Sequence, residues 1–241
     1  MADTKRTREE IKASVAKLKA EALKAEAEAR KVKAEAESAE TKAKKERLEF
    51  ERYKKERAER LAADSQNHVY RFSGAVGDQS VTKCRNTLTE WSRCSPECDI
   101  EIVFASGGGG ITAGFELFDY IQQLRGRGHN ITTGSLGMAA SMAGVLLQAG
   151  EKRWIGHQSW ILIHRAAFGA IGKTFEIEDE VELVKRIEER IIQIFTSRST
   201  LTRLKIKRNW DRKDWWLNAD EALDMGLVDE IKGKLPEGTR E

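Results

Sequence analysis

The chain has 241 residues, of which 34% are charged and 40% are hydrophobic, and this length allows one globular domain together with an extension. Its 42 basic and 39 acidic residues leave a net charge of only +3, which argues against a nucleic-acid-binding protein or one that docks on an anionic membrane. No apolar run is long enough to cross a bilayer, and the charged amino terminus is unlike a secretion signal. We therefore expect a cytoplasmic protein.

The three cysteines are Cys84, Cys94 and Cys98. An odd number of cysteines in a chain without a secretion signal predicts reduced thiols instead of a disulfide framework. Their spacing could supply part of a metal site, but no nearby histidine or fourth thiol completes a tetrahedral set. We expect no metal and no cofactor.

Residues 5–64 are almost entirely Ala, Lys, Glu and Arg without Gly or Pro, a composition that predicts one long helix. Its apolar and small residues recur in alternating steps of four and three, as in a coiled-coil seam. The seam residues are Ile11, Val15, Leu18, Ala22, Ala25, Ala29, Val32, Ala36, Ala39 and Ala43. The repeat weakens at Glu46 and resumes at Phe50 and Tyr53. This pattern predicts a helix-pairing partner along residues 11–53, and a solvated single helix held by Glu and Lys pairs is the alternative.

From residue 67 the sequence alternates between short apolar runs and amphipathic segments. Strands are predicted at 69–72, 100–105, 130–133 and 160–163. Helices are predicted at 77–93, in the segment that ends at residue 126, from about 141 to 150, and at 175–199. Such alternation predicts an α/β fold with a mainly parallel sheet. The expected organisation is therefore a helical extension over residues 1–66 and a globular domain over residues 67–241.

Ser141 lies where a predicted strand runs through the small residues of 134–144 into an apolar helix. A serine at a helix start can use the free backbone N–H groups and the helix dipole to stabilise a developing oxyanion. The alternative is a serine that caps the helix, and on this segment alone capping is the commoner explanation.

His164 directly follows a predicted strand, at the sheet edge where α/β sites gather, and the other three histidines are less well placed. Three carboxylates near the end of the chain could orient it. Asn218 and Glu221 resemble a capping box and Gly226 ends the short helix that they predict. Asp220 falls in the first turn of that helix, where the helix dipole explains it. Asp211 and Asp214 both precede two tryptophans and a leucine, and spacing alone does not choose between them.

A run of four glycines, 107–110, follows a buried strand and precedes a helix. The run lacks the Lys-Ser/Thr of a P-loop and the acidic residue of a dinucleotide-binding fold. Glycines leave room for an extended peptide bound through its main chain. We therefore assign Gly107, Gly108 and Gly110 to substrate binding, together with Phe168 in the segment after His164.

These residues together resemble the Clp protease proteolytic subunit family. Its members carry a Ser-x-Gly-Gly stretch followed by Ile-Thr-Ala-Gly, an Ala-Ser-Met turn, an Ile-His pair, and an Asp ahead of Ala-x-Glu-Ala-x-x-x-Gly-Leu-Val/Ile-Asp. The matching positions here are 106–114, 139–142, 163–164, Asp214 and 219–229. The resemblance implies the spiral α/β fold shared by Clp proteases and crotonases, preceded in this chain by the long helix.

The resemblance also implies a mechanism. Ser141 is then the nucleophile, His164 the base and Asp214 the orienting acid, while the N–H groups of Gly109 and Met142 form the oxyanion hole. The implied reaction is cleavage of a polypeptide through an acyl-enzyme. Members of the family assemble as a ring or double ring of identical subunits, joined by the helix that corresponds here to 175–199.

The sequence departs from the family in three places. Gly107 stands where a proline is usual, and Arg165-Ala166 stands where Gln-Pro is common, so loop rigidity and specificity are affected more than catalysis. In the ordinary subunit the residues ahead of the first strand form loops that engage a partner ATPase. Here that place is taken by the long helix, an arrangement similar to that of viral head-maturation proteases, which cut capsid and scaffold proteins in the host cytoplasm.

Three other functions stay open from the sequence. The chain could be a degradative Clp protease that is fed by an ATPase. It could be an acyl-CoA hydratase or isomerase of the crotonase type, although such enzymes need no Ser, His and Asp set. It could also be a structural subunit without activity, which an intact triad disfavours.

Overall fold

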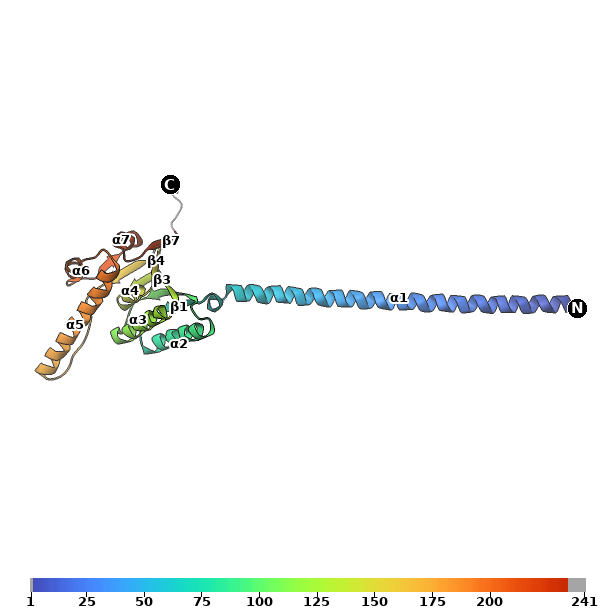
Figure 1. Ribbon diagram of the computed structural model, residues 1–241, viewed down its shortest axis with the longest axis horizontal. Coiled ribbons are helices and arrows are strands. Elements are labelled where there is room, and N and C mark those ends of the chain that lie inside the picture. Colours follow the sequence, from blue (N-terminus) through green and yellow to red (C-terminus); the bar gives the residue numbers. More distant parts are fainter. Residues whose placement is uncertain (1, 234–241) are drawn as a thin grey trace, which may run out of the picture. The chain divides into compact units, whose positions relative to one another are not determined.

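The computed structural model describes residues 2–233, with side chains from residue 10 onward. The chain divides into two compact units, Met1–Ala62 and Ala63–Glu241. The first unit is a single helix, α1 (Ala2–Ala62), which confirms the predicted long amino-terminal helix (Figure 1). A short 3-10 helix, η1 (Asp64–Asn67), follows, and the domain boundary expected at 66/67 falls near its end. The last residues of the expected domain, 234–241, lie outside the described residues.

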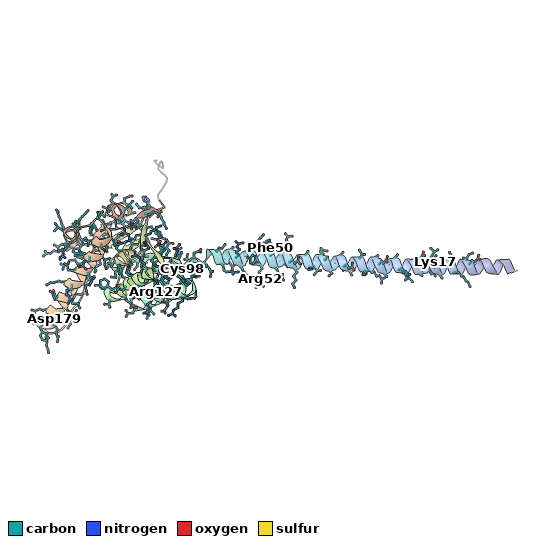
Figure 2. The ribbon with its side chains drawn as sticks, viewed as in Figure 1. Lys17, Phe50, Arg52, Cys98, Arg127 and Asp179 are labelled. Carbon is teal, nitrogen blue, oxygen red and sulfur yellow. The ribbon has the colours of Figure 1, made fainter. Side chains whose placement is uncertain are left out.

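From residue 10 onward the side chains of α1 project into solvent (Figure 2). Every one from residue 10 to residue 62 is exposed, including the seam residues Ile11, Phe50 and Tyr53. Ion pairs between residues one turn apart stabilise the helix, such as Arg52 with Glu56 at 2.9 Å. Each pair contributes roughly a few tenths of a kcal/mol to helix stability. The described part of the chain therefore leaves the seam uncovered, and helix pairing stays a prediction.

The second unit is built on a seven-stranded sheet. In chain order its strands are β1 (Val69–Ser73), β2 (Asp99–Ser106), β3 (Asn130–Ala140), β4 (Lys152–Gly156), β5 (Trp160–Ile163), β6 (Trp215–Leu217) and β7 (Glu230–Lys232). The main path β1-β2-β3-β4-β7 is parallel throughout, β5 pairs parallel with the end of β3, and β6 pairs antiparallel with β5. The mainly parallel α/β fold is thereby confirmed.

The helices of this unit cover the sheet (Figure 1). They are α2 (Asp78–Cys94), α3 (Ile111–Gly126), α4 (Met142–Leu147), α5 (Thr174–Arg198), α6 (Arg203–Trp210) and α7 (Ala219–Asp224). α2 packs against α3, α3 against α4, and α4 against α5. All residues of α4 are buried, so this short helix lies at the centre of the core. Among the described residues, no helix is both long and apolar enough to cross a membrane.

Strand β3 is longer than the sequence predicts. It was expected to end at residue 133 but continues to Ala140, because its later part gains a new partner in β5, with Met138 opposite Trp160. Gly134 does not end the strand. A Cβ at this position would come 2.1 Å from the ring of Trp154, so the glycine is explained by the close approach of that ring.

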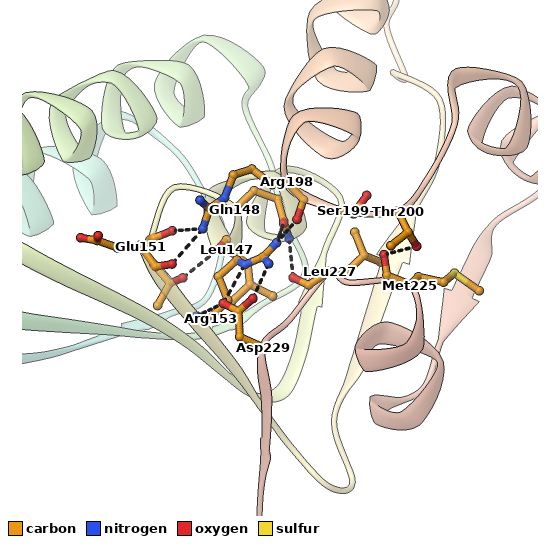
Figure 3. Close-up of polar contacts among 12 residues, drawn as sticks. Leu147, Gln148, Glu151, Arg153, Arg198, Ser199, Thr200, Met225, Leu227 and Asp229 are labelled. Atoms are coloured by element: carbon orange, nitrogen blue, oxygen red, sulfur yellow. Dashed lines mark hydrogen bonds and ion pairs between the residues drawn. The ribbon is translucent and has the colours of Figure 1, made fainter.

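A polar network joins β4, the end of α5 and the segment before β7 (Figure 3). Arg153 of β4 is buried and donates from Nε and Nη2 to the two carboxylate oxygens of Asp229. The same side chain donates to Gln148 Oε1 and to the carbonyl of Arg198, each at 2.7 Å. Burial opposes ionisation of Asp229, but the hydrogen bonds and charge of Arg153 outweigh it and lower the pKa of that carboxyl. The network fixes the end of α5 and the segment before β7 against β4.

The three cysteines are unpaired thiols. Cys84 is buried in α2, and burial raises the pKa of its thiol. Cys94 is exposed and Cys98 is partly buried, 3.6 Å from Nδ1 of the buried His129. Among residues 2–233 no cluster of His, Cys, Asp or Glu side chains is arranged to hold a metal ion.

Candidate active site

Ser141 connects the end of β3 to the start of α4 in an unusual conformation. Its φ is 54° and its ψ is −122°, and a non-glycine residue held there stores strain of roughly 1–3 kcal/mol. Its N–H donates to the carbonyl of Leu162 at 2.9 Å, which holds the serine beside the end of β5. The hydroxyl makes no capping hydrogen bond to α4, so helix capping does not explain the serine.

A cavity of about 160 Å³ opens beside Ser141. Ser141 and His164 line it together with Gly109 and Met142, so four residues that the sequence assigned to catalysis meet at one place. The remaining lining is mainly apolar: Ile111, Val145, Ile163, Arg165, Ala166, Ala167, Ile191 and Phe195. A small apolar cavity with a few convergent polar groups is typical of a binding site for a substrate side chain.

Gly109 and Met142 present backbone N–H groups near the serine. Val76 donates its N–H to the carbonyl of Gly108 and accepts from the N–H of Gly110, each at 2.8 Å. Because successive N–H groups of an extended segment point to opposite sides, the N–H of Gly109 faces away from Val76. The N–H of Met142 lies in the first turn of α4, where helix N–H groups have no intrahelical partner. Two such donors can stabilise an oxyanion.

The glycine run lies close to the serine. A Cβ added at Gly108 would come 2.6 Å from the Cβ of Ser141, and Gly108 itself has a φ of +90°, so both space and conformation require glycine there. Of the four glycines only Gly109 lines the cavity, so Gly107, Gly108 and Gly110 do not. Their assignment to substrate binding stays a prediction.

Phe168 lies in the segment after His164 and is 50% exposed. It does not line the cavity. Its assignment to substrate binding therefore also stays a prediction.

His164 and Asp214 stand at the ends of two paired strands. β5 and β6 run antiparallel with Ile163 opposite Trp215, so continuing the register places His164 opposite Asp214. Asp214 is exposed, and the neighbouring Trp216 is 44% exposed. Within residues 2–233 no hydrogen bond joins Ser141, His164 and Asp214 to one another; in unliganded sites such bonds often tighten only around substrate.

Asp211, the alternative acid, lies in a different electrostatic environment. Its charge contributes to the raised pKa of Arg165, after the larger contributions of Glu188. The charge of Asp211 thus acts on a guanidinium group, whereas the β5–β6 register, continued by one residue, places Asp214 opposite His164.

The residues of α5 that line the cavity were not predicted from the sequence. Ile191 and Phe195 line the cavity, and Glu188 is buried one turn earlier on the same helix. The sequence did not single out Glu188, since an acid in a charged helix is usually solvated. The spacing of 188, 191 and 195 along one helical face is the signal that was available.

Comparison with known proteins agrees with these features. The Clp protease family profile matches residues 55–234, a range that includes Ser141, His164 and Asp214. The chain is also 37% identical over 169 residues to the ATP-dependent Clp protease proteolytic subunit 2 of Tropheryma whipplei (strain Twist), covering 69% of this chain and 92% of that protein. The chain belongs to the Clp protease family, a family of serine endopeptidases.

Proposed function

We propose that the chain cleaves peptide bonds with Ser141 as nucleophile, His164 as general base and Asp214 as the acid that orients the imidazole. The observation that carries this proposal is that Ser141 and His164 line one cavity with Gly109 and Met142. Membership in the Clp protease family removes the acyl-CoA hydratase alternative.

In this mechanism the Ser141 hydroxyl attacks the peptide carbonyl as His164 takes its proton. The carbonyl oxygen becomes an oxyanion, which accepts hydrogen bonds from the N–H groups of Gly109 and Met142. His164 then gives the proton to the leaving amine, and a water molecule activated by the same imidazole releases the acyl group. The apolar lining of the cavity suits an apolar side chain of the substrate.

Clp proteases act as oligomeric rings on polypeptide substrates. For this chain we propose a homo-oligomeric ring or double ring joined through α5. In support, the first half of α5 exposes Phe175, Ile177 and Leu183, which are 58%, 37% and 48% exposed. Apolar side chains clustered on one exposed helix are typical of an interaction surface.

The biological setting that we propose is cleavage of capsid and scaffold proteins during the assembly of a virus, in the host cytoplasm. Support comes from α1, a helix of 61 residues placed directly ahead of the protease unit. Its exposed seam offers a surface on which a scaffold-like helix could pair with the enzyme before cleavage.

The second candidate is an ATPase-fed degradative protease, which the name of the Tropheryma whipplei relative records for that protein. We favour independence from an ATPase, because α1 occupies the chain position of the loops that engage the ATPase in ordinary subunits. Adding a Clp ATPase and ATP to the purified protein decides between the two. Degradation of a folded substrate only in that mixture would support the degradative function.

Labelling with a fluorophosphonate tests the peptidase itself. Wild type should be labelled on Ser141 and should hydrolyse short fluorogenic peptides, whereas Ser141→Ala should do neither, because the hydroxyl is the whole nucleophile. Circular dichroism should show that Ser141→Ala stays folded, since its hydroxyl caps no helix. Absence of labelling and turnover in assembled wild type would instead favour a structural subunit with a vestigial triad.

A further inference from the structure

The two residues that follow His164 are held by one carboxylate from α5. Arg165 donates from Nε to Glu188 Oε1 at 3.0 Å and from Nη2 to Glu188 Oε2 at 3.1 Å. The backbone N–H of Ala166 donates to the same Oε1 at 3.2 Å. Glu188 thus fixes a side chain and a backbone group directly after the catalytic histidine.

Glu188 is an exception on its helix face. It is 7% exposed, and the other buried residues of α5 are Ile191, Ile192 and Phe195. A carboxylate buried among apolar residues is costly unless it is paired and hydrogen-bonded. Its bidentate pair with Arg165 and its bond to Ala166 supply those partners, and geometry of this kind holds a guanidinium group in a defined orientation.

The bond to the N–H of Ala166 bears on the departure from the family at this position. Proline, common there in the family, fixes its own backbone and has no N–H to satisfy. Alanine does not restrict its own backbone in this way, so in this chain the hydrogen bond from its N–H to Glu188 restrains the backbone instead. The hydrogen bond to Glu188 is also the main cause that raises the pKa of Arg165, so the guanidinium stays charged and paired.

We propose that Glu188 is a positioning residue for catalysis: by clamping Arg165 and Ala166 to α5, it sets the orientation of His164 toward Ser141. This inference rests on the proposed peptidase function. His164 precedes the clamped pair directly, and all three residues from 164 to 166 line the cavity. A misplacement of about 1 Å in a reacting group can cost on the order of 100-fold in rate.

Glu188→Gln in the full-length protein tests the clamp. Glutamine keeps the size of the side chain but loses the charge-assisted pair with Arg165. We expect kcat for a short fluorogenic peptide to fall about tenfold or more while KM changes little, because the loss lies in the alignment of the reacting groups. The rate of fluorophosphonate labelling should fall in parallel.

Glu189→Gln is the matched control. Glu189 is the next residue of α5, but its carboxylate pairs with Lys207 and Arg203 on the side of α6. Glu189→Gln should leave kcat within about twofold of wild type, because the partners of Glu189 lie on α6 and not in the segment that follows His164. Its melting temperature should change little, since exposed ion pairs contribute little to stability. Melting temperatures of both variants separate a catalytic effect from unfolding.

A double-mutant cycle with Arg165→Gln completes the test. If both residues act through their ion pair, Glu188→Gln with Arg165→Gln should lose no more kcat than Glu188→Gln alone. Additive losses, or an unchanged kcat and labelling rate in folded Glu188→Gln, would overturn the positioning role while the peptidase stands. A wild type that is neither labelled nor active would overturn the proposed function and the inference with it.

Discussion

The pairing of the two short strands β5 and β6 favours Asp214 over Asp211 as the acid that orients His164. The register of β5 and β6, continued by one residue, places Asp214 opposite His164, whereas the charge of Asp211 contributes to the raised pKa of Arg165. Asp214→Asn should therefore lower kcat by about 100-fold or more, because an amide favours the wrong imidazole tautomer, and Asp211→Asn should have a much smaller effect. Steady-state kinetics on a short peptide measures both, and the reverse ranking would move the acid to Asp211.

At the level of single residues, the sequence identified the cavity-lining serine, histidine and oxyanion-hole candidates from motifs whose order is specific. It could not identify the strained φ of Ser141, because no local pattern reveals that the residue joins β3 to α4 while its N–H bonds to Leu162 of β5. Nor could it single out Glu188. An acid in a helix rich in charges is usually solvated, and only tertiary packing shows that this one is buried.

At the scale of elements, the pair between Arg153 and Asp229 joins β4 to the segment before β7. The pKa of Asp229 is lower in the folded protein than in the unfolded chain. The stabilisation is therefore complete above the unfolded value, about 3.9, and is lost as the pH falls below it through the folded value. Asp229→Asn should lower the free energy of unfolding at pH 7 and matter much less near pH 3.

Urea unfolding at the two pH values checks this expectation. Asp224→Asn serves as the control, because Asp224 is an exposed carboxylate at the end of α7. Equal effects of Asp229→Asn at pH 7 and pH 3 would show that the ion pair does not supply the acid-sensitive part of the stability.

The elements that the sequence predicted are those with a strong apolar period. The strands that it did not predict, β4, β6 and β7, are short, and two of them have three residues each. They are held by pairing with β3, β4 and β5, which no local pattern reveals. The polar helix α6 was missed for a similar reason, since Ile206 and Trp210 are its only buried residues.

At the scale of the whole molecule, the role of α1 can be separated from that of the protease unit. A chain that lacks residues 1–64 should still cleave short peptides, because every residue that lines the cavity lies in the second unit. It should cleave its preferred protein target much more slowly if α1 recruits that target. Equal cleavage of the protein target by both chains would make α1 a passive extension.

Point variants sharpen that experiment. Val15→Asp with Val32→Asp changes the seam, whereas Leu23→Asp with Leu48→Asp changes exposed residues of the same helix that lie off it. If the seam binds a partner helix, only the first pair should weaken cleavage of the protein target, since a buried charge disrupts helix pairing. Equal effects of the two pairs would point to general loss of apolar surface.

The left-handed φ of Ser141 implies that the nucleophile lowers the folding stability of the protein. Ser141→Gly should remove the strain that Ser141→Ala keeps, because only glycine adopts a φ of 54° without cost. After the entropy that glycine loses on folding is subtracted, we expect the glycine variant to exceed the alanine variant by about 1 kcal/mol in unfolding free energy. Thermal denaturation of the two variants measures the difference. The active enzyme would then be less stable than a variant without the nucleophile, so selection for folding stability alone would favour loss of Ser141.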